Sequence, residues 1–231
     1  MKRFWNSAEA VAQDDHWTVE LDGKPVRLPG GGALAVPSAH LARALAAEWQ
    51  AAGGEFTYDD LPFTRLAGTA QERVVVAREA VIEELARYGE SDLLCYRAEI
   101  PVSLVEAQAQ LWQPWIDWAA RELGSELVVT QGIVHVAQPP AALAALTQAV
   151  AMLDEWRLAA LGVLVPALGS LVLGLAVVRG ALAASEAHEI ATLDERHQAA
   201  FWGWDAEAQT RLMRVGADLA MAGRFLDACA E

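Results

Sequence analysis

Five side chains near the C-terminal end of the chain are of types that bind metal ions. They are His188, Glu189, Asp194, Glu195 and His197. A zincin site needs the spacing HExxH, which brings two imidazoles to one face of a helix at positions i and i+4. Here the two histidines are nine residues apart, and no ExxH pair indicates a di-iron bundle. Residues 188 and 195 do share a helical face, so a weak site stays open, but we predict no metal.

The candidate nucleophiles and phosphate-binding loops also lack the surroundings that catalysis needs. None of the serines lies in a GxSxG motif. Ser170 lies in an apolar stretch, where a hydroxyl most simply bonds a backbone carbonyl. Cys95 follows two leucines and is most simply a small buried hydrophobe. The glycines at 30–32 form neither a P-loop nor a GxGxxG motif and favour a turn. We therefore predict no catalytic residue, no cofactor and no enzyme activity.

Tryptophan carries more information, with nine in the chain. Trp112, Trp115 and Trp118 follow one another at a spacing of three, which makes a wide indole stripe on a helix. The stripe is either the aromatic edge of a core, because each indole buries a large area, or a groove for a partner, because Trp is prominent at interface hot spots. Trp202 and Trp204 raise the same question near the C-terminal end. Trp112, Trp115 and Trp202 are candidate partner-binding residues.

Charged side chains stand within two otherwise apolar segments. Asp92 and Arg97 flank the run 93–96, and Asp194 and Glu195 lie shortly before Gln198. A buried charge without a partner costs several kcal/mol, so such groups must be paired or hydrogen-bonded. They are either structural ion pairs or polar anchors for a partner segment. Asp92, Arg97, Glu195 and Gln198 therefore join the candidate partner-binding residues.

Acidic residues outnumber basic ones by 31 to 17, for a formal net charge of −14 at pH 7. Such a surface repels phosphate backbones and anionic lipids, which argues against a nucleic-acid partner and against membrane docking. It serves solubility alone or matches a basic protein partner. Cys95 and Cys229 are far apart without metal-type spacing, which is typical of a reducing compartment. With no signal-peptide pattern at the N-terminus, we expect a cytoplasmic protein.

Residues 158–178 carry no charge and are long enough to cross a bilayer. Pro166 and three glycines interrupt the stretch, and no Lys/Arg cluster or aromatic belt flanks it. Because Pro removes a helix hydrogen bond and clashes with the preceding turn, a break near Pro166 would leave two short buried helices. We favour a buried core, with a membrane span as the alternative.

The first sixty residues have the patterning of a small β-rich domain. Apolar and polar residues alternate over 16–28 around Asp22-Gly23, which is the strongest short signal for a β-hairpin. Residues 33–36 favour another short strand. Ser38 is a plausible N-cap for a helix over 39–51. We predict a β-rich N-terminal domain with one helix over residues 1–62.

The remainder of the chain has helical periodicity. An amphipathic helix is expected over 71–88, closed by Gly89, and another from Pro101 to a stop at Gly124. Further helices are expected over 140–163, over 168–183, after Ser185 and over 205–228, with a hairpin or an extended segment at 126–136. The predicted fold class is α+β: the small β-rich domain followed by a larger, mostly α-helical domain over residues 63–231.

Motifs with the order and spacing of one known family run along nearly the whole chain. They are KRFW near the start, VELDGKPVRLP (19–29), LARALAAEWQA around Trp49, LPFTRLAGTA (61–70), YGESDLLCYRAEIP (88–101), WQPWIDWA from Trp112, QGI from Gln131, LGSLVLGLAV from Leu168 and LDERHQAAFWG (193–203). DLLCYR and the arrangement E-x-x-Q-x-x-x-W-G are fairly specific, whereas LDGKP alone is weak. On these motifs the chain resembles the family of assembly chaperones that bind the alpha subunit of the ATP synthase F(1) head, known from mitochondria and related bacteria.

The resemblance implies a soluble, non-catalytic protein that shields the alpha subunit from aggregation until the beta subunit replaces it. The alpha subunit is then the partner, with no nucleic acid, no membrane insertion and no small-molecule substrate. The location would be the bacterial cytoplasm, or the mitochondrial matrix in eukaryotic relatives. The acidic residue of the family pattern falls on Glu195, with Gln198, Trp202 and Gly203. Members often carry Tyr where His197 stands, so no role of a phenol transfers to that position.

A different class of function stays open beside this one. A hydrolase or small-molecule-binding protein could use a pocket near Tyr96, Arg97 and Glu195. Tyr96 is a partner-binding candidate under the chaperone interpretation as well.

Overall fold

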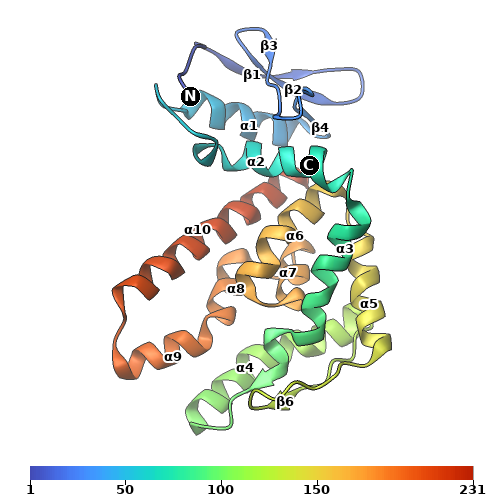
Figure 1. Ribbon diagram of the computed structural model, residues 1–231, viewed down its shortest axis with the longest axis vertical. Helices are drawn as coiled ribbons and strands as arrows, with labels where there is room; N and C mark the ends of the chain where they lie inside the picture. The colour runs from blue at the N-terminus through green and yellow to red at the C-terminus, as the bar shows by residue number, and fades with distance from the viewer. Residues whose placement is uncertain (231) are drawn as a thin grey trace. The chain divides into compact units, whose positions relative to one another are not determined.

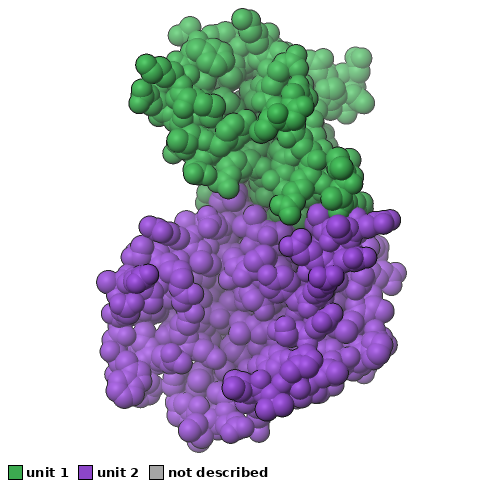
Figure 2. Space-filling model, viewed as in Figure 1, with its two compact units in different colours: residues 1–78, 154–160, 224–231 green, residues 79–153, 161–223 purple. Residues whose placement is uncertain are grey.

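The computed structural model describes residues 1–230. The chain divides into two compact units, shown in green and purple in Figure 2. Unit 1 comprises residues 1–78, 154–160 and 224–231, and unit 2 comprises residues 79–153 and 161–223. The architecture is α+β, with a small N-terminal sheet followed by a helical region, as predicted. The boundary at residues 62 and 63 stays a prediction.

A four-stranded antiparallel sheet forms the N-terminal part of unit 1. Its strands are β1 (Ala8–Ala12), β2 (Trp17–Leu21), β3 (Lys24–Pro25) and β4 (Ala35–Val36), with β2 paired to the other three. The predicted hairpin is confirmed, because Leu21 pairs with Lys24 across Asp22 and Gly23. Those two turn residues have φ of 47° and 78°, the left-handed conformation that Asp-Gly adopts in tight hairpin turns.

Helix α1 (Ala39–Ala51) packs on the sheet, against β1 and β2 (Figure 1). The Ser38 hydroxyl accepts from the Leu41 N–H at 3.1 Å, which confirms the predicted N-cap. At the other end of the helix, the Glu48 carboxylate accepts from the backbone N–H groups of Phe63 (2.7 Å) and Thr64 (2.9 Å). Burial raises the pKa of Glu48. This carboxylate caps the start of α2 (Pro62–Gly68) and so ties α2 to α1.

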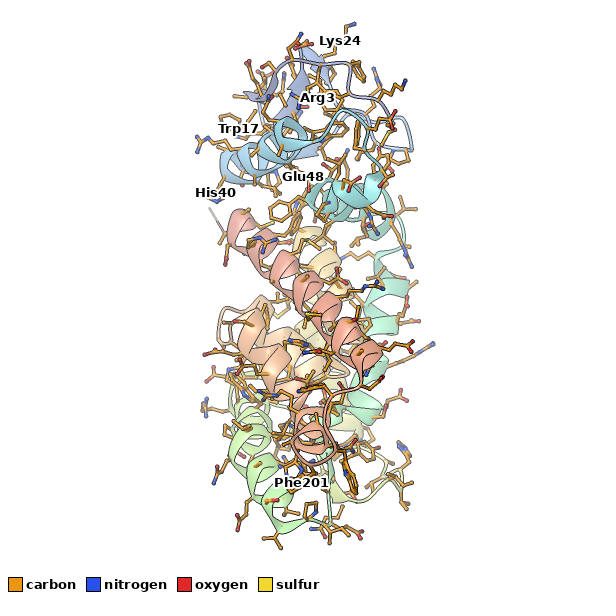
Figure 3. All side chains as sticks on the ribbon, turned by 90° about the vertical axis from the view of Figure 1, so that its left-hand side faces the viewer. Arg3, Trp17, Lys24, His40, Glu48 and Phe201 are labelled. Atoms are coloured by element: carbon orange, nitrogen blue, oxygen red, sulfur yellow. The ribbon has the colours of Figure 1, made fainter. Side chains whose placement is uncertain are left out.

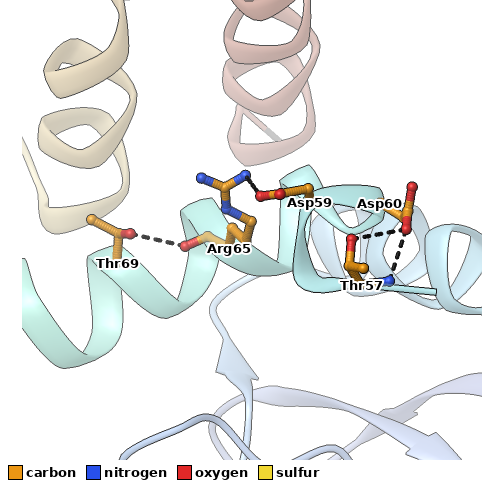
Figure 4. Close-up of polar contacts among 5 residues, drawn as sticks. All are labelled: Thr57, Asp59, Asp60, Arg65 and Thr69. Carbon is orange, nitrogen blue, oxygen red and sulfur yellow. Dashed lines mark hydrogen bonds and ion pairs between the residues drawn. The ribbon is translucent and has the colours of Figure 1, made fainter. Parts of the chain in front are cut away.

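A one-turn 3-10 helix (Tyr58–Asp60) leads into α2, and side-chain contacts fix its geometry (Figure 4). The Asp60 carboxylate accepts from the Thr57 N–H at 2.8 Å and from the Thr57 hydroxyl at 3.0 Å. Asp59 pairs with Arg65 of α2 at 2.7 Å. The turn and the helix are therefore held as one local element of unit 1.

The helical region is built from eight more α-helices in the described part of the chain. They are α3 (Arg78–Ala86), α4 (Val102–Trp118), α5 (Pro140–Ala151), α6 (Glu155–Leu168), α7 (Leu171–Val178), α8 (Ala184–Ala191), α9 (Leu193–Trp202) and α10 (Ala206–Cys229). The start of α4 after Pro101 and its end before Gly124, which has φ of 70°, agree with the sequence prediction. A π-helical turn (Ala119–Leu123) completes that helix.

Two boundary predictions were wrong. The helix expected over 71–88 is a π-turn (Thr69–Val74) and then α3, because three consecutive β-branched valines at 74–76 disfavour a continuous helix. The helix expected over 140–163 is interrupted, and Asp154 caps the restart by accepting from the Arg157 N–H at 2.8 Å. Of the two alternatives left open for residues 126–136, the structure has the extended segment and not the hairpin: β6 (Thr130–Gln131) pairs in parallel with β5 (Tyr96–Arg97).

The apolar stretch 158–178 forms α6 and α7 rather than one long helix. Pro166 lies on the exposed face of α6, one turn after Gly162, and the chain turns at Gly169, which has φ of 63°. The Ser170 hydroxyl then accepts from the Leu173 N–H and starts α7, in which all eight residues are buried. Within residues 1–230 no helix is long and apolar enough to span a membrane.

A buried carboxylate holds α7 in place. Asp92 is 0% exposed, and its two oxygens accept from the Leu94 N–H at 3.1 Å and the Val172 N–H at 3.0 Å. It therefore caps two segments, the 3-10 turn Leu93–Cys95 and the first turn of α7. Burial raises the pKa of Asp92, and the hydrogen bonds from Val172, Ser170 and Leu94 oppose that rise.

Replacing Asp92 by Ala should destabilise the protein by about 2–4 kcal/mol, because two buried N–H groups lose their acceptor. Asp218→Ala is the matched control, since Asp218 is exposed on α10, and should change stability by less than about 0.5 kcal/mol. Urea unfolding followed by circular dichroism measures both. Equal losses in the two variants would contradict the capping role.

The close approach of α6 and α7 depends on Gly174. A Cβ atom at that position would lie 2.7 Å from Val165 Cγ2 and 3.0 Å from Leu161 Cδ1. Gly174→Ala should therefore destabilise unit 2 by about 1–2 kcal/mol through overpacking. Gly162→Ala should be neutral or stabilising by up to about 1 kcal/mol, because its Cβ would meet nothing within 4 Å while helix propensity improves. Thermal unfolding of the two variants tests this, and stabilisation by both would show that α6 and α7 are not in tight contact.

Candidate partner-binding site

The indole stripe of α4 lies mostly in the core of unit 2. Trp112 is 0% exposed and its Nε1–H donates to the Ile190 carbonyl at 2.9 Å. Trp118 is buried, and Trp115 is half-buried with its ring edge-on to Trp118 at 6.1 Å. The core interpretation thus describes Trp112 and Trp118, and a contact of Trp112 or Trp115 with a partner stays a prediction.

The buried Arg97 side chain connects the segment before α4 to the middle of that helix. Its Nε donates to the Leu94 carbonyl at 2.8 Å and its Nη1 to the Gln108 carbonyl at 3.0 Å. Its guanidinium carbon lies 5.6 Å from the centre of the Trp112 ring, a cation–π contact. Burial lowers the pKa of this guanidinium. In the described chain Arg97 makes no ion pair with Asp92, so neutral groups satisfy both buried charges.

The three residues of the hydrolase alternative have separate partners. The Tyr96 hydroxyl bonds His135 Nδ1 at 3.1 Å, Arg97 bonds the carbonyls of Leu94 and Gln108, and Glu195 pairs with Arg211 at 3.1 Å.

Burial and the neighbouring Asp92 raise the pKa of the Cys95 thiol to about 12, so it is not a thiolate nucleophile at neutral pH.

A shallow pocket of unit 1 is lined by other residues. Its lining includes Leu28, Pro29, Tyr58, Arg65, Glu72 and Arg73. It holds none of the candidate residues named from the sequence.

Within residues 1–230 no group of three His, Cys, Asp or Glu side chains is placed to hold an ion. His188 instead packs against α10, where a Cβ on Gly216 would lie 3.0 Å from its ring. Burial lowers the pKa of His188.

Helix α9 carries the candidate residues that remain exposed, and polar contacts attach its first turns to α4. Gln108 of α4 donates to the Asp194 carboxylate at 2.8 Å. His197 Nε2 lies 3.0 Å from the Ser103 hydroxyl oxygen, also on α4. Both contacts are on the side of α9 that faces α4. Glu195 and Gln198 lie on the exposed surface of α9.

Large apolar side chains are exposed where α9 ends. Phe201 is 68% exposed, Trp202 89% and Trp204 45%. Figure 3 labels Phe201 on α9, and its ring lies 5.1 Å from that of His197. We call Phe201, Trp202 and Trp204 the aromatic tip. Trp202 and Trp204 were singled out in the sequence, and Phe201 was missed.

Two further exposed apolar residues lie at the start of α4. Ile100 is 81% exposed and Val102 68%. Val102 immediately precedes Ser103, which contacts α9 through His197. No sequence signal distinguished these two from core residues, because their exposure depends on how α4 and α9 pack. The arrangement offers apolar contact area and charged groups, not a catalytic constellation.

The chain is similar to known proteins of one family. Residues 2–120 match the family described as ATP12 chaperone protein. The crystal structure of Atp12 from Paracoccus denitrificans superposes with a TM-score of 0.94 at 42% identity, over 99% of this chain and 98% of that one. The structure of Atu1473 from Agrobacterium tumefaciens has a TM-score of 0.92 at 34% identity, over 100% of this chain and 86% of that one.

A similar sequence is found in a eukaryote. The mitochondrial protein atp12 of Schizosaccharomyces pombe is 25% identical over 214 residues, which are 87% of this chain and 74% of the yeast protein. Because the family match spans more than half of the chain and the likeness to the Paracoccus protein spans nearly all of it, the chain belongs to the ATP12 chaperone family, the chaperones of ATP synthase F(1) assembly.

Proposed function

We propose that this protein binds the unassembled alpha subunit of the ATP synthase F(1) sector, keeps it from aggregating, and yields it to the beta subunit. Family membership supports the class of partner, an ATP synthase subunit. Our choice of the binding surface rests on one observation: Trp202 is 89% exposed and lies beside the exposed Phe201. Exposed aromatics that adjoin each other mark interaction sites, because leaving them in water forgoes burial energy.

The aromatic tip provides the main part of the affinity in this proposal. Covering one large apolar side chain contributes about 1.5–3 kcal/mol, and Trp is among the residues most enriched at hot spots. Val102 and Ile100 extend the apolar area on the α4 side. An apolar surface of the alpha subunit that the beta subunit normally covers is a suitable counterpart.

The candidate residues divide into two roles. Gln198 is exposed and supplies specificity, which is what polar groups at interfaces mainly contribute. Glu195 is exposed as well and supplies the orientation of the binding surface. Asp92, Arg97, Trp112 and Trp115 act indirectly, because they hold the helices that carry the exposed residues. Tyr96 acts in the same way through its bond to His135.

The charge balance supports a basic counterpart rather than an acidic one. With a net charge of −14, the protein repels acidic surfaces and attracts basic ones at long range. Release needs only that the beta subunit bury more of the same alpha surface, so the chaperone itself consumes no ATP. In a bacterium this exchange takes place in the cytoplasm, where the F(1) sector assembles.

Trp202→Ala should lower the recovery of co-expressed alpha subunit about tenfold or more, because truncating a hot-spot Trp costs on the order of 2 kcal/mol of binding energy. Its melting temperature should be unchanged, since the indole is almost fully exposed. Affinity co-purification and thermal unfolding measure the two quantities.

Phe4→Ala is the matched control, because Phe4 is 76% exposed in unit 1. It should leave recovery of the alpha subunit at the wild-type level. Equal recovery from both variants would remove the aromatic tip from the binding surface.

A further inference from the structure

Helices α9 and α10 form a hairpin, and the aromatic tip lies at its turn. α9 ends at Trp202, and Gly203 follows with φ of 81°. The Asp205 carboxylate accepts from the Ala208 N–H at 3.2 Å and caps α10. The direction in which the two indoles point therefore depends on how the two helices are held beside this short turn.

Packing holds the first part of α10 only in part. Among residues 206–218 none is fully buried and four are half-buried, and the first buried side chain of the helix is Leu219. The approach of α10 to α8 becomes close at Gly216, beside His188. About two and a half turns of α10 thus lie between the tip and the first tight contact.

One ion pair spans the hairpin in this part. Arg211, in the second turn of α10, pairs with Glu195 of α9 at 3.1 Å. Both side chains are partly exposed, 63% for Arg211 and 44% for Glu195. The other hydrogen bonds in this stretch, from Ala208 to Asp205 and from Thr210 to Ala206, stay within α10.

We propose that Arg211 is a positioning residue for partner binding, which acts by holding α10 against α9 through Glu195. The inference rests on the proposed function. It adds Arg211 to the residues on which binding depends, and it explains how Glu195 affects binding. An exposed ion pair is a weak interaction. Here no residue of 206–218 is fully buried, so the ion pair contributes to the orientation of the hairpin, and its loss lets the aromatic tip adopt more orientations.

The alternative is that Glu195 contacts a cation of the partner directly. In that case Arg211 competes with the partner for the same carboxylate, and its removal leaves binding unchanged or tighter. The two mechanisms therefore predict opposite effects of changing Arg211, and only positioning allows the two charges to be exchanged.

A charge-exchange experiment separates them. The dissociation constant for purified alpha subunit is measured for wild type, Glu195→Arg, Arg211→Glu and the double variant. We expect each single variant to bind about three- to tenfold more weakly, since an attraction becomes a repulsion, and the double variant to return to within about twofold of wild type.

The matched control is Arg214→Glu, which makes the same charge change on the same helix. Arg214 is exposed and forms no ion pair within residues 1–230, so the variant should bind within about twofold of wild type. The melting temperatures of all variants should agree, because no core contact changes. Amide hydrogen exchange over residues 206–215 should be faster in each single variant and normal in the double one.

Weak binding by the double variant, or unimpaired binding by Arg211→Glu, would overturn the positioning role. Failure of the wild-type protein to bind the alpha subunit would instead remove the proposed function. The exchange rates over 206–215 would still show whether the ion pair orders the hairpin, and unchanged rates in the single variants would overturn that as well.

Discussion

The structure of the helical unit depends on the burial of α7. All eight of its residues are buried, so every neighbouring helix must present an apolar face to it and every polar group at its ends must find a partner inside the protein. Asp92 and Ser170 provide those partners at the N-terminal end. The absence of a side chain at Gly174 lets α6 approach closely enough to exclude voids.

The same constraint explains why the charged and aromatic residues divide into two groups. Side chains on the inward faces of α4 and of the segment before it make their hydrogen bonds within the protein. Trp112 bonds a carbonyl of α8, and Arg97 bonds carbonyls before and within α4. These groups are fixed and already satisfied. Side chains at the end of α9 are instead exposed, with Phe201 at 68% and Trp202 at 89%.

Such a surface suits a chaperone better than an enzyme. A catalytic site concentrates groups whose protonation is tuned to a reaction, within reach of one another. Here Asp92 and Arg97 are buried and hydrogen-bonded and the Cys95 thiol is buried, whereas Phe201 and Trp202 at the end of α9 are exposed aromatic rings.

Local sequence determined the features that depend on neighbouring residues. The Asp22-Gly23 hairpin, the Ser38 cap, the stop at Gly124 and the family motifs were all readable, because turn and cap geometry needs only a few adjacent side chains. Periodicity could not show that the valines at 74–76 break a helix or that residues 130–131 pair with 96–97. The periodicity of the sequence also could not distinguish the buried Trp112 from the exposed Trp202. Each indole follows the same helical pattern, and only the packing of helices distant in sequence decides which face meets the core and which meets water.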